Sequence, residues 1–153
     1  MQLAQLSVSL ENQTGRLAEM TDTLADAGIN LRALTLSDTS EFLVLRLIVD
    51  NTAKAYKILK AANFTAKITE VVAVEVNDQP GALAQVLHVL DSNRVSMDYM
   101  YAFVEQFADK AVLLFRFKDQ EEAIKVLSEN NIRVLTAEEV EADSPFLGET
   151  PKL

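Results

Sequence analysis

The sequence contains no cysteine, which excludes disulfides, thiolate metal ligands and a thiol nucleophile. The single histidine, His88, lies beside the apolar stripe of an expected helix, so we predict a partly exposed surface residue and no Ser-His-Asp arrangement. No glycine-rich phosphate loop occurs, and the acidic run Glu138, Glu139, Glu141 and Asp143 lacks the spacing of a calcium loop. We therefore expect no catalytic residue, no metal and no cofactor: the chain is not predicted to be an enzyme.

Long apolar runs are also missing, since no stretch approaches the ~18 residues that a membrane span needs. Residues 1–10 alternate apolar and polar side chains without a basic segment or a cleavage site, so we expect a cytoplasmic protein with no membrane partner. Basic residues are outnumbered, with 14 Lys and Arg against 23 Asp and Glu, for a net charge of -9. That charge would repel phosphate backbones, so nucleic acid is not an expected partner.

What the chain does have is a repeated order of elements. In the first copy, alternation over residues 4–10 predicts a strand, and three- and four-residue apolar steps over 17–27 predict a helix closed by Gly28. A hairpin over 29–36 and 42–49, a helix capped within 50–52 and a strand over 64–68 follow.

The second copy starts at residue 72 and repeats the order β-α-β-β-α-β. A strand over 72–76 and a helix over 83–90 precede a hairpin over 95–104 and 111–117, which residues 106–110 lengthen. A helix around 123–127 and a strand over 132–135 complete it. We expect domains at 1–69 and 70–136, followed at 137–153 by an acidic C-terminal tail without regular structure.

Apolar residues stand on both faces of the predicted third strand, where Phe42, Val44 and Ile48 oppose the side that faces the helices. The second hairpin shows the same over 95–104. Helices cover one face only, so a partner surface is expected on the other. We favour a homodimer; the alternative is that the repeats or the tail cover these faces within one chain.

A polar residue followed by a glycine precedes the first helix of each copy, in Asn12-Gln13-Thr14-Gly15 and Asn77-Asp78-Gln79-Pro80-Gly81. Free amides and the positive end of a helix dipole can bind a carboxylate there. Asn and Asp are also ordinary N-caps, so each turn is either a cap or a ligand site.

These turns, the strand start Gly28-Ile29-Asn30-Leu31 and the doubled order of elements resemble the ACT domain, a regulatory module of amino-acid metabolism. The resemblance covers residues 1–136. It implies an α+β, ferredoxin-like fold with antiparallel four-stranded sheets, helices on one face, and two domains joined side by side into an eight-stranded sheet.

The resemblance also implies that a free amino acid, the effector, binds at the seam between domains. Helix-start amides would hold its carboxylate, and Asn12, Asp78 or strand carbonyls its ammonium group. The residues carried over to this site are Asn12, Gln13, Thr14, Gly15, Arg16, Leu17, Asn30, Leu31, Asn77, Asp78, Pro80, Gly81, Ala82, Leu83, Ser96 and Met97.

Two departures from the family pattern stand out: Thr14 occupies a position where proline is common, and Arg94 stands where the first copy has Gly28. One seam could thus bind while the other is structural. Two functions remain open. The chain is a free-standing amino-acid sensor, or it is the regulatory subunit of a separate catalytic chain such as acetolactate synthase.

Overall fold

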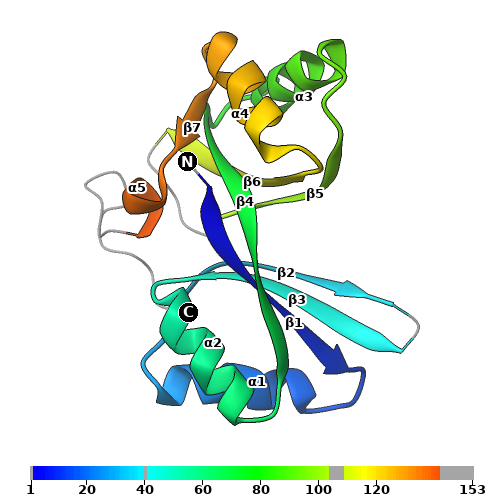
Figure 1. Cartoon of the computed structure of the whole chain (residues 1–153), viewed down its shortest axis with the longest axis vertical. Helices are drawn as coiled ribbons and strands as arrows, with labels where there is room; N and C mark the ends of the chain where they lie inside the picture. The colour runs from blue at the N-terminus through cyan, green and yellow to red at the C-terminus, as the bar shows by residue number, and fades with distance from the viewer. Residues whose placement is uncertain (1, 40, 104–108, 142–153) are drawn as a thin grey trace. The chain divides into compact units, whose positions relative to one another are not determined.

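The computed structural model describes residues 2–39, 41–103 and 109–141. Its contacts divide these residues into an N-terminal unit, 4–69, and a C-terminal unit, 70–141, which also takes in residues 2 and 3. Each unit contains one β-α-β-β-α-β repeat (Figure 1). Val104, the predicted loop 106–108 and the tail from 142 onward lie outside the described residues.

The N-terminal unit carries its strands in the order β2-β3-β1-β4, with β2 and β1 antiparallel to β3. Its elements are β1 (Leu3–Glu11), α1 (Arg16–Asp26), β2 (Leu31–Asp38), β3 (Phe42–Val49), α2 (Thr52–Ala61) and the first part of β4 (Thr65–Asn77). The predicted third strand, 42–49, is confirmed with the same limits. The predicted cap of the second helix is confirmed as Asn51, whose Oδ1 accepts a hydrogen bond from the amide of Lys54 at 3.0 Å.

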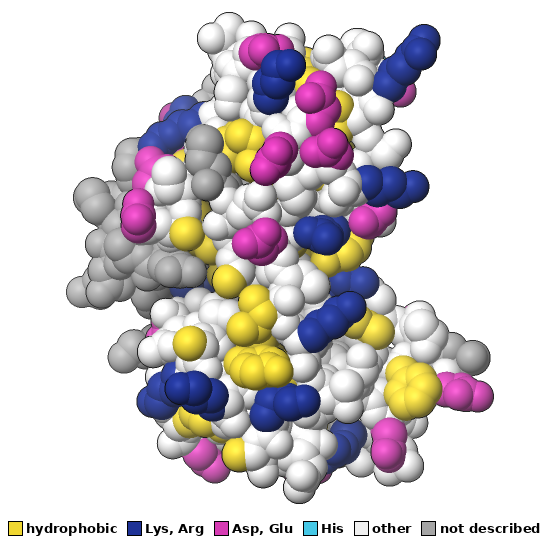
Figure 2. All heavy atoms as spheres, viewed as in Figure 1, with side chains coloured by type: hydrophobic (Ala, Val, Ile, Leu, Met, Phe, Trp, Pro, Cys, Tyr) yellow, Lys and Arg dark blue, Asp and Glu magenta, His cyan; other side chains and the backbone are white. Residues whose placement is uncertain are grey.

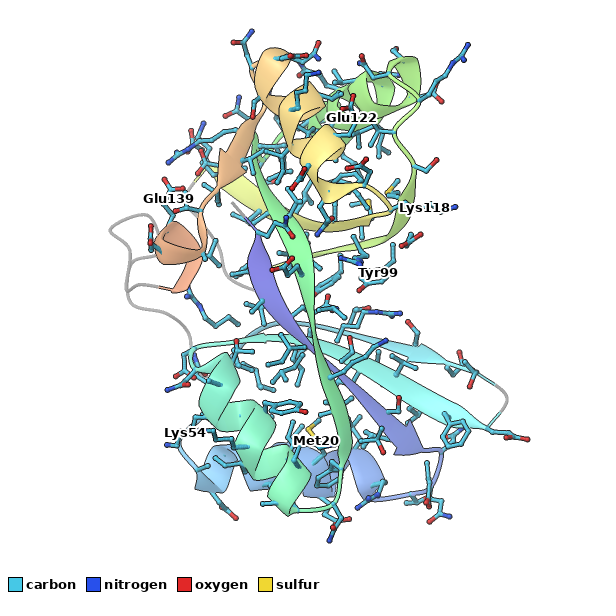
Figure 3. The ribbon with its side chains drawn as sticks, in the orientation of Figure 1. Met20, Lys54, Tyr99, Lys118, Glu122 and Glu139 are labelled. Carbon is cyan, nitrogen blue, oxygen red and sulfur yellow. The ribbon has the colours of Figure 1, made fainter. Side chains whose placement is uncertain are left out.

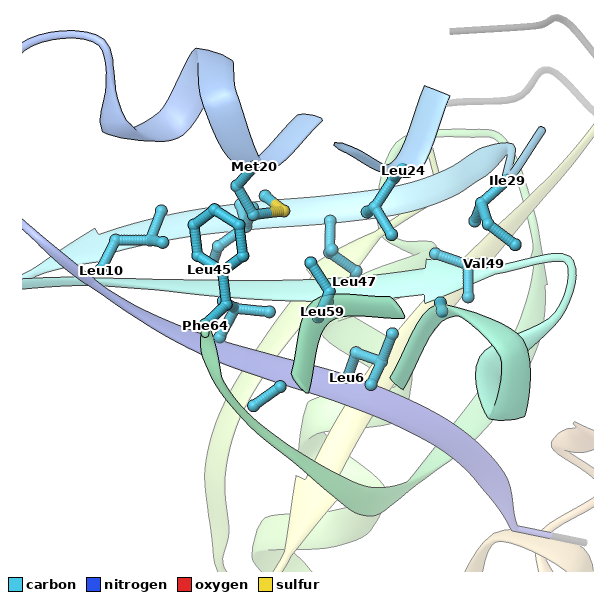
Figure 4. Packing of buried hydrophobic residues seen from close by; sticks show 13 residues of the cluster. Leu6, Leu10, Met20, Leu24, Ile29, Leu45, Leu47, Val49, Leu59 and Phe64 are labelled. Atoms are coloured by element: carbon cyan, nitrogen blue, oxygen red, sulfur yellow. The ribbon is translucent and has the colours of Figure 1, made fainter. Parts of the chain in front are cut away.

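Both helices of this unit lie on one face of the sheet, as Figure 1 shows. Period-2 apolar residues of the strands, among them Leu6 and Leu47, meet helix residues such as Met20, Leu24 and Leu59 in one buried cluster (Figure 4). Gly28 ends the first helix with a φ of +73°, a conformation that glycine adopts without strain.

The C-terminal unit repeats this plan, with β6 antiparallel to β4 and β5, and β7 antiparallel to β4 on its other side. Its elements are the second part of β4, α3 (Ala82–Ser92), β5 (Met97–Ala102), β6 (Lys110–Phe117), α4 (Gln120–Glu129) and β7 (Arg133–Leu135). A second core forms around Val74, Phe115 and Leu127. The predicted fold class, two βαββαβ repeats with antiparallel sheets, is confirmed.

The fourth strand of the first repeat and the first strand of the second are one continuous strand, β4, where the sequence predicted two. The chain between residues 68 and 72 contains neither glycine nor proline, so nothing interrupts the extended backbone. Among the described residues there are thus seven strands instead of eight. The joining of both sheets side by side stays a prediction.

Exposure differs among the residues expected on the open faces. Ile48 is 1% exposed and Tyr101 8%, whereas Phe42 is 47% exposed at the start of β3. The expected homodimer stays a prediction.

A short helix, α5 (Ala137–Glu141), stands where the sequence predicted the start of an irregular tail. Thr136 and Glu139 explain it: the Thr136 hydroxyl accepts the amide of Glu139 at 3.2 Å, and the Thr136 amide donates to Glu139 Oε2 at 2.8 Å. This reciprocal capping box nucleates the turn, and Val140 is buried beneath it.

Candidate functional site

The two predicted turns have the same backbone geometry. Gly15 is the N-cap of α1, with φ 87° and ψ -13°, and Gly81 is the N-cap of α3, with φ 90° and ψ -10°. Both glycines are left-handed, a conformation that carries a penalty for residues with a Cβ. The repeat is therefore preserved in backbone detail at this point.

The hydrogen bonds of the two turns also correspond. The amide of Gln13 donates to the carbonyl of Glu11 at 2.8 Å, and the amide of Gln79 donates to Asn77 at 2.9 Å. Each turn is tied to its hairpin as well, by Asn12 N to Glu41 O at 3.4 Å and by Asp78 N to Asp109 O at 2.8 Å. The sequence between strand and helix is thus held in one shape in both units.

No described side chain caps the start of α1 or α3. The alternative that Asn12 or Asp78 serves as an ordinary N-cap is therefore wrong, because the caps are the glycines. The first-turn amides of a helix have no acceptor within the helix, and they carry its positive dipole end.

A pocket of about 470 Å³ opens at the start of α3, within the C-terminal unit. Its walls come from the end of β4, the first turn of α3, the start of β6 and the connection from α4 to β7. They are formed by Glu75, Val76, Asn77, Gln79, Pro80, Gly81, Ala82, Gln85, Val86, Lys110, Asn131, Ile132 and Arg133. This volume falls within the ordinary range for small-molecule sites.

Two cations and one carboxylate line this C-terminal pocket. Lys110 Nζ donates a hydrogen bond to Asn77 Oδ1, and Arg133 Nη1 donates to Glu75 Oε1 at 3.0 Å. Glu75 and Arg133 are directly opposite each other on β4 and β7. The wall of the pocket therefore presents one negative and one positive group at adjoining positions.

Arg133 extends beyond the pocket, because its Nη2 also donates to Glu139 Oε1 on α5 at 2.8 Å. This hydrogen bond to Glu139 raises the pKa of the guanidinium. The amide of Thr136, and after it Arg133, lower the pKa of the Glu139 carboxyl.

The N-terminal unit has a pocket of about 480 Å³ at the corresponding place. Its walls are Ser9, Glu11, Arg16, Thr39, Phe42, Val44, Asn63 and Thr65. Arg16 occupies the position that Ala82 has in the second repeat. Its guanidinium lies 4.3 Å from the centroid of the Phe64 ring, and its Nη1 pairs with Glu19 at 3.0 Å.

Five of the sixteen predicted site residues line these pockets: Arg16 in the N-terminal pocket and Asn77, Pro80, Gly81 and Ala82 in the C-terminal pocket. The pocket walls do not include Asn12, Gln13, Thr14, Gly15, Leu17, Asp78 or Leu83, although these belong to the same two junctions.

The strand-start residues Asn30, Leu31, Ser96 and Met97 lie elsewhere in their units. Asn30, whose amide donates to Asp50 Oδ1 at 3.2 Å, follows the C-terminal end of α1, whereas Gly15 precedes its start. A helix of 11 residues is about 16 Å long, so no small ligand spans both within one unit. The predicted seam between domains stays a prediction.

The sequence did not predict the residues of the C-terminal pocket wall that come from other strands and connections, such as Lys110, Asn131 and Arg133. Strand pairing carries the signal for two of them, since antiparallel register places Lys110 opposite Asn77 and Arg133 opposite Glu75. Asn131 and Asn63 each follow the end of a helix. Both have a positive φ, 58° and 63°, which is common for an Asn at that position.

Within the described residues, the other candidate side chains form no site. His88 is exposed on α3, where the sequence predicted a partly exposed surface residue. The described residues contain no group of acidic and histidine side chains that could hold a metal. None of the described helices is long and apolar enough to cross a membrane. Acidic and basic side chains are interspersed on the face in Figure 2.

Comparisons with known proteins identify the family and the fold of the chain. A family model described as "ACT domain pair" matches residues 1–142. A crystal structure of a protein from Bacteroides thetaiotaomicron is 40% identical, covers 92% of this chain and 96% of its own, and superposes with a TM-score of 0.86.

The regulatory subunit of aspartate kinase from Thermus thermophilus shares the fold at 14% identity and a TM-score of 0.57, over 82% of this chain and 91% of its own. No curated protein sequence matches the chain. The family match and the 40% identical structure each span nearly the whole sequence. The chain therefore belongs to the ACT domain pair family.

Proposed function

We propose that this protein is a non-catalytic regulator of amino-acid metabolism that binds a free amino acid in the C-terminal pocket. The proposal rests on a structural feature that occurs in both repeats: a pocket of similar volume lies at a helix start whose N-cap is a left-handed glycine. The domain limits 1–69 and 70–136 belong to the same proposal.

The charges of the C-terminal pocket match the two ends of a zwitterion. The positive dipole end of α3 and the cations Lys110 and Arg133 favour a carboxylate, while Glu75 favours an ammonium group. The remaining wall includes Val76, Val86 and Ile132, which leaves room beside the charged groups for a side chain.

Two differences favour this pocket over the N-terminal one. Ala82 leaves the first turn of α3 open, whereas Arg16 is held there in the first repeat by Phe64 and Glu19. The first turn of α1 also contains an acid, Glu19, while that of α3 contains none. A carboxylate ligand therefore meets less electrostatic repulsion at the start of α3 than at the start of α1.

A thermal-shift screen of the twenty free amino acids tests this proposal. At a hundredfold excess over the dissociation constant, binding stabilises the folded state by about 2.7 kcal/mol, which a melting curve resolves. Ala82→Leu should narrow the pocket and abolish the shift. Ala84→Leu is the matched control, because Ala84 is exposed in the same helix turn but is not part of the pocket wall. An unchanged shift in Ala82→Leu would place the ligand elsewhere.

The second candidate function is a regulatory subunit of a separate enzyme. It is favoured by the shared fold with regulatory subunits of aspartate kinase and by the half-exposed Phe42. Size-exclusion chromatography separates the two. A homodimer that one amino acid stabilises supports the sensor, whereas a protein that aggregates until it is co-expressed with a catalytic chain supports the subunit.

A further inference from the structure

Arg133 connects the C-terminal pocket to α5. Its Nη1 lies 3.0 Å from Glu75, on the pocket wall, and its Nη2 lies 2.8 Å from Glu139, which Figure 3 labels on α5. The same guanidinium thus bridges a group that faces the pocket and a group that belongs to the helix.

The helix α5 depends on contacts outside itself. It has five residues, and a helix of this length is not stable without tertiary contacts. Glu139 supplies much of that support, since Oε2 accepts from the Thr136 amide while Oε1 accepts from Arg133. Val140, 2% exposed, is the buried apolar anchor.

The geometry points to a competition for Arg133: we propose that the carboxylate of a ligand in the C-terminal pocket takes the place of Glu139 on the guanidinium and so releases α5. The inference rests on the proposed function, since it assigns the regulation of that same pocket. A guanidinium has five donors in a planar fork that suits a free carboxylate.

Linkage makes the competition reciprocal. If the ligand weakens the hold of Arg133 on Glu139, then Glu139 weakens the binding of the ligand by the same factor. Removing the Glu139 charge therefore raises affinity, and α5 is the element whose order reports occupancy of the pocket.

The experiment compares Glu139→Gln with wild type and with Glu138→Gln. Both variants remove one carboxylate from α5, but Glu138 is exposed and forms no ion pair with any other residue that the structure describes. Two measurements are made with each of the twenty free amino acids in turn: affinity by calorimetry, and amide hydrogen exchange of residues 137–141.

The expected result has three parts. A bound amino acid speeds exchange in α5 of the wild type and of Glu138→Gln. Glu139→Gln binds that amino acid about two- to fivefold more tightly, the range for an exposed ion pair. Its α5 exchanges rapidly already without ligand and changes little on binding.

Two other outcomes distinguish a failure of the competition from a failure of the proposed function. If an amino acid binds all three proteins equally and leaves α5 exchange unchanged, the competition is refuted while the proposed function stands. If none of the twenty binds any of them, both are overturned.

Discussion

Gly15 and Gly81, 66 positions apart in the sequence, have φ values within a few degrees of each other, 87° and 90°. Both begin a helix, and an added Cβ at either position would contact nothing within 4 Å. The cost of any other residue there is therefore conformational and not steric.

Replacing Gly81 by valine should destabilise the protein by at least about 1–2 kcal/mol and abolish the amino-acid thermal shift, because a β-branched residue strains the left-handed N-cap. Urea denaturation and the thermal-shift screen measure the two effects. Gly81→Asn is the control, since asparagine tolerates positive φ better and should retain most of both. A full ligand shift in Gly81→Val would remove this junction from the site.

The caps of α2 and α4 should contribute equally to stability. Asn51 Oδ1 accepts from Lys54 N, and Asp119 Oδ1 accepts from Glu122 N, both at 3.0 Å. Alanine at either position should lower the free energy of unfolding by about 1 kcal/mol, while exchanging Asn for Asp should change it little. Equal loss in the Ala and Asn↔Asp variants would show that these bonds do not form.

Leu59 should be among the costly positions of the N-terminal core. It is 0% exposed on α2, so Leu59→Ala is expected to cost about 2–5 kcal/mol. Leu34→Ala, at a leucine that is 38% exposed on β2, should cost much less. Comparable losses in urea denaturation would mean that the Leu59 side chain is not enclosed as described.

Acid should loosen α5. The pKa of Glu139 is lowered in the folded state. The ionised carboxylate therefore stabilises α5 at any pH above the ordinary pKa of a glutamate, and this contribution is lost as the pH falls through the lowered pKa. A carbon-detected NMR titration should place the pKa of Glu139 below the ordinary range of a glutamate, and amide exchange over 137–141 should accelerate as the pH falls through it. A Glu139 pKa within the ordinary range of a glutamate would contradict the pairing with Arg133.

Local patterns predicted most of the fold because each element depends on its own residues. The third strand, 42–49, and the Asn51 cap were recognisable from period-2 apolar residues and a side-chain acceptor. The sequence does not predict the helix α5 although Thr136 and Glu139 have the spacing of a capping box, because an acidic composition is also typical of an irregular tail.

The pocket was harder to predict because its wall is assembled from distant segments. The sequence indicated the junction at Gly81, but Lys110 and Arg133 reach it through strand pairing with Asn77 and Glu75. Which strands pair, and in which register, depends on the packing of the whole unit and not on any local motif.

The uninterrupted strand β4 restricts where residues can be inserted into the chain or deleted from it. Hairpin loops absorb added residues at little cost, as the longer second hairpin illustrates. One extra residue between Thr69 and Val72 would put the two parts of β4 out of their period-2 alternation, so a bulge would have to form there. Insertions and deletions of a single codon should therefore be tolerated at the hairpin tips and rejected at this join.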